Sequence, residues 1–285
     1  MPSQFPDKPV PSLTLLADRV AQHTVPDLRK IVSAARKTLS APIPRDPYLE
    51  SVATKSESHR FLANSTQAVY TRHIRCLGEI LAAVTNRPAQ EMSILDWGCG
   101  KGQITYLLRQ RGFAVTSCDI ENQEADDSTF GQEVPIIREQ TIDVVPLRHA
   151  YQLPFADKSF DCVISFGVLE HVKSDRDSLG EIRRVLKDQG ILYITFLPYF
   201  LSWTQHIAHL RGETYHDRLY KERTFTVLAE SFGFKLVDVS HGQLFPKNSV
   251  PLSLDRTLEP LDRWLCAHTP LRYFATNLEA VLIAD

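Results

Sequence analysis

The stretch "ILDWGCGKGQITYLL", Ile94 to Leu108, joins an apolar run to an amphipathic segment through a turn that contains three glycines. The apolar run ends in Asp96, and the glycines follow at 98, 100 and 102. Glycine adopts positive φ angles and lets a ligand approach the backbone without meeting a Cβ atom. A buried strand, a glycine turn and a helix in this order are typical of α/β proteins that bind nucleotide-like ligands.

Outward from this stretch, strand-like and helix-like patterns alternate along the chain. Apolar runs at 93–98, 114–120, 161–167 and 190–197 predict buried parallel strands, and further strands are predicted at 235–240 and 278–284. Helical spacing predicts a helix at 174–190, started by Ser174 or Asp175 and ended by Gly190, and another at 223–234. This alternation predicts a doubly wound α/β sheet that binds its ligand at the carboxyl ends of the strands.

The residues before this alternating region are predicted to be helical. After a proline-rich start, apolar residues recur at helical spacing in 13–23, 26–40 and 65–85, and a proline cluster at 41–48 separates the last two. We therefore expect an N-terminal helical extension or cap at 1–90 and a ligand-binding domain at 91–285. The alternative is that the extension acts as a dimerisation arm, which would make the protein a homodimer.

Composition narrows the class of protein. The chain has 285 residues and a net charge of −2, so it lacks the basic surplus of nucleic-acid-binding proteins, and we expect no nucleic-acid partner. The N-terminus has prolines and acids where a secretion signal needs a basic patch, and no window is long and apolar enough for a transmembrane segment. The five cysteines are scattered without metal-site spacing, which predicts reduced, buried thiols and a cytoplasmic location.

The glycine turn and a second acid define the ligand class. Asp119 ends the next predicted strand, where a carboxylate is suited to binding both hydroxyls of a ribose. The turn lacks the Gly-Lys-Ser/Thr ending of a triphosphate-binding loop, and Gln103 occupies the place of the third glycine of a dinucleotide turn. Asp96 would repel a pyrophosphate but attract the ammonium and sulfonium of S-adenosylmethionine (SAM). SAM is therefore the predicted cofactor, and S-adenosylhomocysteine (SAH) the product.

Three motifs in this order resemble one family. "ILDWGCGKG" (94–102) resembles the first motif of the class I SAM-dependent methyltransferases, "LPFADKSFDCVISFGVLEHV" (153–172) resembles the fourth-strand region of their broad bacterial small-molecule group, and "EIRRVLKDQGILYIT" (181–195) resembles the helix and fifth strand of the same group. The resemblance implies a Rossmann-like, seven-stranded, mostly parallel sheet whose last strand is antiparallel. It implies transfer of the SAM methyl group and is weakly informative about the acceptor.

The resemblance also assigns roles to residues of this chain. The residues that it places around SAM are Asp96, Gly98, Cys99, Gly100, Gly102, Asp119, Ile120, Ala150, Tyr151, Ser165 and Phe166. Asp119 would hold the ribose, and Ile120 would lie against the adenine. The family often has an acid at the position of His149, where it meets the adenine amino group, so Ala150 and Tyr151 are expected to close that end of the pocket instead.

Residues 197–225 are the predicted acceptor-site insertion, because they follow the fifth strand beside the cofactor site. They are rich in aromatic and histidine side chains, and those predicted to bind substrate are Tyr199, Trp203, His206, Tyr215 and Tyr220. Oxygen methylation needs a base to remove the acceptor's proton, and a neutral histidine suits that role near pH 7. His216 and His171 are the candidate catalytic bases, and no motif predicts a metal site.

Several alternatives stay open at this point. The acceptor is either a small organic molecule or one linked to a lipid or glycan, and methylation at nitrogen or carbon competes with methylation at oxygen. His171 and its neighbour Glu170 fit a structural role at the start of a crossover equally well. The rivals from other classes are an NAD-type oxidoreductase, disfavoured by Asp96 and Gln103, and a binding protein that keeps the fold without turnover.

Overall fold

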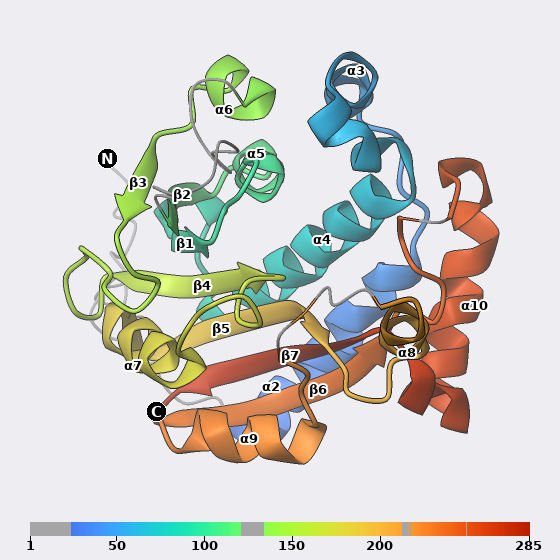
Figure 1. Cartoon of the computed structure of the whole chain (residues 1–285). Helices are drawn as coiled ribbons and strands as arrows, with labels where there is room; N and C mark the ends of the chain where they lie inside the picture. The colour runs from blue at the N-terminus through green and yellow to red at the C-terminus, as the bar shows by residue number, and fades with distance from the viewer. Residues whose placement is uncertain (1–23, 121–133, 213–215, 217, 249) are drawn as a thin grey trace, which may run out of the picture.

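The computed structural model describes residues 24–120, 134–212, 216, 218–248 and 250–285 (Figure 1). The strands are β1 (Ser93–Trp97), β2 (Ala114–Ile120), β3 (Val144–Leu147), β4 (Phe160–Phe166), β5 (Leu186–Pro198), β6 (Phe234–Gly242) and β7 (Asn277–Ala284). The α-helices are α2 (Val25–Ala35), α3 (Pro47–Lys55), α4 (Thr66–Thr85), α5 (Gln103–Gln110), α6 (Pro135–Glu139), α7 (Asp175–Val185), α8 (Trp203–Leu210), α9 (Glu222–Glu230) and α10 (Asp255–His268). Short 3₁₀ helices are η1 (Arg36–Ser40), η2 (Glu57–Ala63), η3 (Ala89–Glu91), η4 (Leu252–Leu254) and η5 (Pro270–Phe274). The helix predicted at 13–23 lies outside the described residues.

The seven strands form one sheet in the order β3-β2-β1-β4-β5-β7-β6. The pairs β1–β2, β2–β3, β1–β4 and β4–β5 are parallel, whereas β7 runs antiparallel to both β5 and β6. The predicted seven-stranded, mostly parallel sheet with an antiparallel last strand is therefore confirmed. The strand order reverses between β1 and β4, which places the switch point of the sheet directly after the glycine-containing turn.

Helices cover both faces of the sheet (Figure 1). Neighbouring residues of β1 show the alternation: Ile94 packs in a cluster that includes Leu77 of α4, and Leu95 packs in a second cluster that includes Leu179 of α7. The first cluster also contains residues of α2 and α5, and the second contains residues of α9. The burial of both faces explains why the strands read as continuous apolar runs rather than as alternating ones.

The N-terminal extension forms part of one of these helical layers. The helix predicted at 65–85 is confirmed as α4, and its apolar stripe is buried against the sheet. The Arg36 guanidinium follows α2 and donates hydrogen bonds to Asp238 of β6 at 2.6 Å and to Glu279 of β7 at 2.8 Å. The boundary predicted at residue 90 therefore does not separate two hydrophobic cores among the described residues.

One predicted helix end is wrong. Ser174 caps α7 as expected, since its hydroxyl accepts a hydrogen bond from the Asp177 amide, but the helix ends at Val185 rather than at Gly190. Leu186 instead pairs with Phe160 and begins β5. Gly190 lies inside this strand, where an added Cβ would be 2.8 Å from the Lys187 carbonyl oxygen. The glycine therefore permits close backbone packing rather than ending a helix.

Two predictions from composition can be compared with the structure. All five cysteines are buried free thiols, as predicted. Within the part of the chain that the structure describes, no helix combines the length and the apolar character that crossing a membrane requires.

Candidate active site

The glycine turn connects β1 to α5 in a conformation that glycine favours. Gly98, Gly100 and Gly102 have φ angles of 75°, 52° and 81°. A Cβ atom added to Gly98 would lie 2.5 Å from Cγ2 of Val168, in the segment that follows β4. A Cβ atom on Gly100 would meet no described atom within 4 Å, so the backbone there borders open space. The turn thus packs tightly on one side and leaves room for a ligand on the other.

Substitution of Gly98 tests this packing. We expect Gly98→Ala to lower the free energy of unfolding by about 1–3 kcal/mol, because alanine is strained at positive φ and its Cβ would overlap Val168. Gly212→Ala is the matched control, since Gly212 has the same φ of 75° but open space around its Cβ position. Chemical denaturation of the two variants measures the difference. Equal losses of unfolding free energy in the two variants would show that the contact with Val168 does not contribute to the effect.

Asp96 lies beneath the turn rather than beside it. Its side chain is buried, Oδ2 accepts a hydrogen bond from the Thr105 hydroxyl of α5 at 2.6 Å, and Thr105 is in turn 2.8 Å from the Ser117 hydroxyl of β2. Burial raises the pKa of this carboxyl to about 7, and the nearby charge of Asp119 adds to the shift. Below the turn there is therefore a carboxyl group whose ionisation a bound cation would favour.

Asp119 ends β2 and anchors the turn from the other side. Its Oδ2 accepts a hydrogen bond from the Gly100 amide at 2.6 Å, and its Oδ1 accepts one from the Ile120 amide at 2.7 Å. Burial raises the pKa of this carboxyl as well. Ile120 follows with 37% of its surface exposed, so an apolar face stands next to the acid. The prediction that a ribose lies on Asp119 and an adenine on Ile120 fits this arrangement and stays a prediction.

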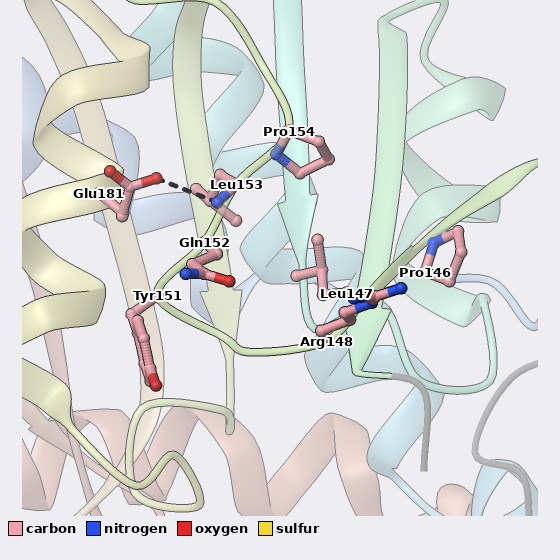
Figure 2. Close-up of a pocket in the computed structure, with 8 residues that line it drawn as sticks. All are labelled: Pro146, Leu147, Arg148, Tyr151, Gln152, Leu153, Pro154 and Glu181. Atoms are coloured by element: carbon pink, nitrogen blue, oxygen red, sulfur yellow. Dashed lines mark hydrogen bonds between the residues drawn. The ribbon is translucent and has the colours of Figure 1, made fainter. Parts of the chain in front are cut away.

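The loop after β3 supplies the other predicted contacts with the adenine. The Ala150 carbonyl accepts a hydrogen bond from Trp97 Nε1 at 3.2 Å, and the Tyr151 ring stacks on His149 with 5.1 Å between ring centroids. Figure 2 shows Tyr151 lining a pocket on this loop, where Glu181 of α7 accepts a hydrogen bond from the Leu153 amide at 3.0 Å. The loop is thus fixed at both ends, by β1 and by α7.

The remaining predicted cofactor residues lie at the same edge of the sheet. Ser165 and Phe166 are the last residues of β4. The Ser165 hydroxyl is buried and has no hydrogen-bond partner among the described residues. The Cys99 side chain is buried, so its contribution to a ligand would come from the backbone of the turn.

This set of residues fits SAM, which supplies a methyl carbon activated by a sulfonium when it is bound. The open space at Gly100 leaves room for the ligand, and the buried Asp96 and half-buried Asp119 carboxyl groups, both with raised pKa values, suit a cationic, ribose-bearing molecule. Gly100 and Asp119 would hold its methionine and ribose parts.

The two candidate bases are brought together although they are far apart in the sequence. The ring centroids of His171 and His216 are 5.2 Å apart. His171 Nε2 lies 3.8 Å from Oε1 of Glu170, a buried carboxyl whose pKa burial raises to about 7. The three side chains each offer one ligand atom within 4.8 Å of the others, so they form a group that could also hold a metal ion. The sequence spacing did not indicate this group.

The four described residues among those predicted to bind substrate are divided between the core and the surface. Tyr199 and Tyr220 are buried core residues, and the Tyr220 hydroxyl donates to the Leu169 carbonyl and to Asp175. Trp203 and His206 are exposed on α8, where their ring nitrogens lie at hydrogen-bond distance from the backbone carbonyls of residues 244 and 202. Tyr215 lies outside the described residues. These placements give the proposed substrate roles of the four described residues little support.

Three residues that the sequence did not predict for the site lie on the side of Glu170, whose carboxyl and the Phe196 Cβ flank Gly167. They are Tyr70 of α4, Phe196 of β5 and Lys247, which follows β6. Lys247 Nζ lies 3.6 Å from the centre of the Phe196 ring and 5.6 Å from that of Tyr70. They come from three distant segments, so no local motif could have linked them.

Comparisons with known proteins identify methyltransferases as similar to this chain. Residues 95–194 match the model of a methyltransferase domain family. An uncharacterized methyltransferase, YodH of Bacillus subtilis, is 28% identical over 61% of this chain and 74% of its own length. The ubiquinone biosynthesis O-methyltransferase of Rickettsia bellii is 30% identical over 42% of this chain and 53% of its own length, and the O-methyltransferase cnsE of Penicillium expansum is 31% identical over 54% and 55%.

Solved structures show the same fold. A SAM-dependent methyltransferase from Thermotoga maritima superposes with a TM-score of 0.52 at 13% identity, covering 90% of this chain and 98% of that one. A chain in a complex with the Trm112 methyltransferase activator of Haloferax volcanii superposes with a TM-score of 0.51 at 18% identity, covering 85% and 100%. The chain spans about half the length of the two named O-methyltransferases that it matches. Together with the strand order, these matches place residues 95–194 in a methyltransferase domain family and show that the sheet has the class I SAM-dependent methyltransferase fold.

Proposed function

We propose that the protein transfers the methyl group of SAM to an oxygen atom of a small organic acceptor, with His171 and His216 as its acid–base pair. The observation that carries this proposal is the 5.2 Å separation of the two imidazole rings beside the buried Glu170 carboxyl. An imidazole can accept the hydroxyl proton of the acceptor, and a neighbouring carboxylate stabilises the imidazolium that results. The names of the Rickettsia and Penicillium relatives also favour oxygen as the site of methylation.

The position of the pair suits this role. Glu170 and His171 follow β4. They therefore lie at the same end of the sheet as the glycine turn, where the methyl donor is predicted to bind. The Gly98 contact with Val168 connects the two segments directly. A base placed here would lie beside the acceptor rather than beside the adenine end.

An acceptor linked to a lipid is the second candidate, because apolar side chains are exposed near the C-terminus. Leu261 and Trp264 of α10 are 43% and 55% exposed, and Phe274 of η5 is 53% exposed. Such a surface is suited to contact with an acyl or prenyl chain. The chemistry of methyl transfer proposed above is the same for either acceptor.

A transfer experiment tests the proposal. The protein is incubated with methyl-labelled SAM and a matched set of phenol, aniline and thiophenol, and the products are identified by mass spectrometry. We expect label on the oxygen of phenol. Label on nitrogen alone would contradict oxygen methylation and support nitrogen methylation. Binding of SAM without any transfer would favour a binding protein that keeps the fold.

Removal of metal ions separates the acid–base pair from a metal site built by the same residues. We expect the rate of phenol methylation to be unchanged by EDTA, since imidazole acts without a metal. Loss of activity that a divalent cation restores would assign Glu170, His171 and His216 to the metal instead.

A further inference from the structure

An aromatic cluster lies at the carboxyl ends of β4 and β5, against α4. Its rings are Tyr70, Phe166 and Phe196, with centroid separations of 5.5 Å for Tyr70–Phe196, 5.7 Å for Phe166–Phe196 and 6.2 Å for Tyr70–Phe166. Tyr70 and Phe166 are only partly buried. The cluster therefore has accessible ring surface near the end of β4.

The Phe196 ring is directed into the cluster from a strained backbone position. Phe196 has a φ angle of 61°, which is rare for a bulky side chain. It lies where the pairing of β5 with β7 shifts register between Ile194 and Leu197, as at a β-bulge. Bulges re-aim side chains and are frequent beside active sites, and strain of this kind is typical of functional positions.

Lys247 places a positive charge on this cluster. Its Nζ lies 3.6 Å from the centre of the Phe196 ring and 5.6 Å from that of Tyr70. Among the described residues, no carboxylate is within ion-pair distance of this ammonium group. Burial lowers its pKa to about 8, although Glu170 and Glu279 act in the opposite direction. The charge is thus desolvated and lacks a direct counterion.

The opposite wall of the cluster contains polar atoms that need partners. A Cβ atom on Gly167 would lie 3.5 Å from Glu170 Oε1 and 3.7 Å from the Cβ of Phe196, so carboxyl and ring flank the same glycine. Glu170 Oε2 and the hydroxyls of Ser165 and Thr195 are buried without a hydrogen-bond partner among the described residues. Leaving such buried groups unpaired is unfavourable, so a polar ligand would be favoured here.

From this arrangement we propose that Lys247 binds an anionic oxygen, a carboxylate or a phenolate, of a planar acceptor whose ring lies against the aromatic cluster. The inference rests on the proposed function, because it names the class of acceptor for the same site. A neutral acceptor would leave the partly buried ammonium without a counterion, and a cationic one would be repelled by it. The aromatic rings favour a planar molecule through stacking and edge contacts.

Binding of simple probes tests the inference without turnover. Benzoate, 4-nitrophenolate, benzamide and benzylamine are titrated calorimetrically into the protein saturated with SAH. We expect at least one of the two anions to bind about tenfold or more tightly than benzamide and benzylamine. The two anions distinguish a carboxylate from a phenolate. Equal binding of benzamide or benzylamine, or no binding of any probe, would overturn the inference.

Variants of Lys247 test whether this residue is responsible for the binding of the anion. Lys247→Met should lower the affinity for the preferred anion by about tenfold or more, and Lys247→Arg should retain most of it. Lys221→Met is the matched control, because Lys221 Nζ lies 4.6 Å from the centre of the Phe200 ring but belongs to an exposed residue outside the cluster. Unchanged anion binding in Lys247→Met would overturn the inference.

The outcome is separable from that of the proposed function. The SAH affinity of Lys247→Met should match that of the parent protein, since the ammonium group of Lys247 lies against Phe196 and Tyr70 and not against the glycine turn. Lys247-dependent binding of an anion, combined with label on nitrogen in the transfer experiment, would refute oxygen methylation and leave the inference standing. Label on phenol oxygen with no preference for anions would support oxygen methylation and refute the inference about Lys247.

Discussion

Replacing His216 or His171 with alanine is expected to lower kcat for phenol by about 10²-fold or more, the loss typical for removal of a general base. Phenol holds its proton at neutral pH, so its oxygen becomes a good nucleophile only when a base accepts that proton. The two rings lie 5.2 Å apart, and His171 is also 3.8 Å from Glu170. The measurement is the steady-state rate of phenol methylation for each variant.

Acceptors of different acidity distinguish a histidine that acts as a base from one that has only a structural role. An acidic phenol such as 4-nitrophenol is largely ionised at alkaline pH and needs no base, so the variants should methylate it at nearly the parent rate. His268→Ala is the control, because His268 is exposed on α10 and its Nδ1 lies 3.0 Å from the Trp264 carbonyl. An equal loss for both phenols would show that the histidines position other groups, and unaltered turnover in both variants would remove the base from the proposal.

The arrangement of the glycine turn and its two acids, which form the proposed cofactor side of the site, was largely predictable from the sequence because its signals are local. The glycine turn, the acid that precedes it and Asp119 lie within one strand–helix–strand unit, so their spacing fixes their geometry. The structure adds that Asp96 lies beneath the turn and accepts a hydrogen bond from Thr105, which spacing alone could not show. A side chain's depth depends on the packing of α5 on the sheet, and the sequence specifies that packing only indirectly.

Some elements were missed because their signals are short or have two meanings. Strand β3 has only four residues and includes Pro146, which weakens a strand pattern. Gly190 resembles the glycine that ends a helix, yet it serves close packing inside β5. Both cases depend on contacts with neighbouring strands rather than on the local sequence.

The acceptor side was the least predictable because it is assembled from distant segments. Tyr70, Phe196 and Lys247 belong to α4, β5 and the segment after β6. The aromatic residues of 197–225 were natural candidates, but Tyr199 and Tyr220 are used in the core. Aromatic side chains serve cores and binding sites alike, so composition cannot distinguish the two uses.

The largest effect on the cofactor side is expected from Asp96. In the protein without ligand, burial raises the pKa of this carboxyl to about 7, so at neutral pH it is only partly ionised. A cation bound above the turn stabilises the ionised form and lowers this pKa. By linkage, SAM affinity should fall by up to about tenfold for each pH unit below about 7 and level off above it.

Asp96→Asn separates this titration from the others in the site. The amide keeps an oxygen that can accept the Thr105 hydroxyl, but it carries no charge at any pH. We expect SAM to bind about 10- to 100-fold more weakly than to the parent protein at about pH 8, with little dependence on pH down to about 6. Asp119, whose pKa is also raised, remains in both proteins, so its contribution cancels in the comparison.

The stability of the ligand-free protein should change in the opposite direction. A carboxyl whose pKa is raised by folding imposes no cost below its unfolded pKa of about 4; the cost grows as the pH rises from about 4 to about 7 and is constant above that. The unfolding temperature of Asp96→Asn, relative to that of the parent protein, should therefore rise between about pH 5 and about pH 8. Asp188→Asn, at an exposed ion pair with Lys158, should show neither effect. Equal pH slopes of SAM affinity in the parent and in Asp96→Asn would mean that the charge beneath the turn does not act on the cofactor.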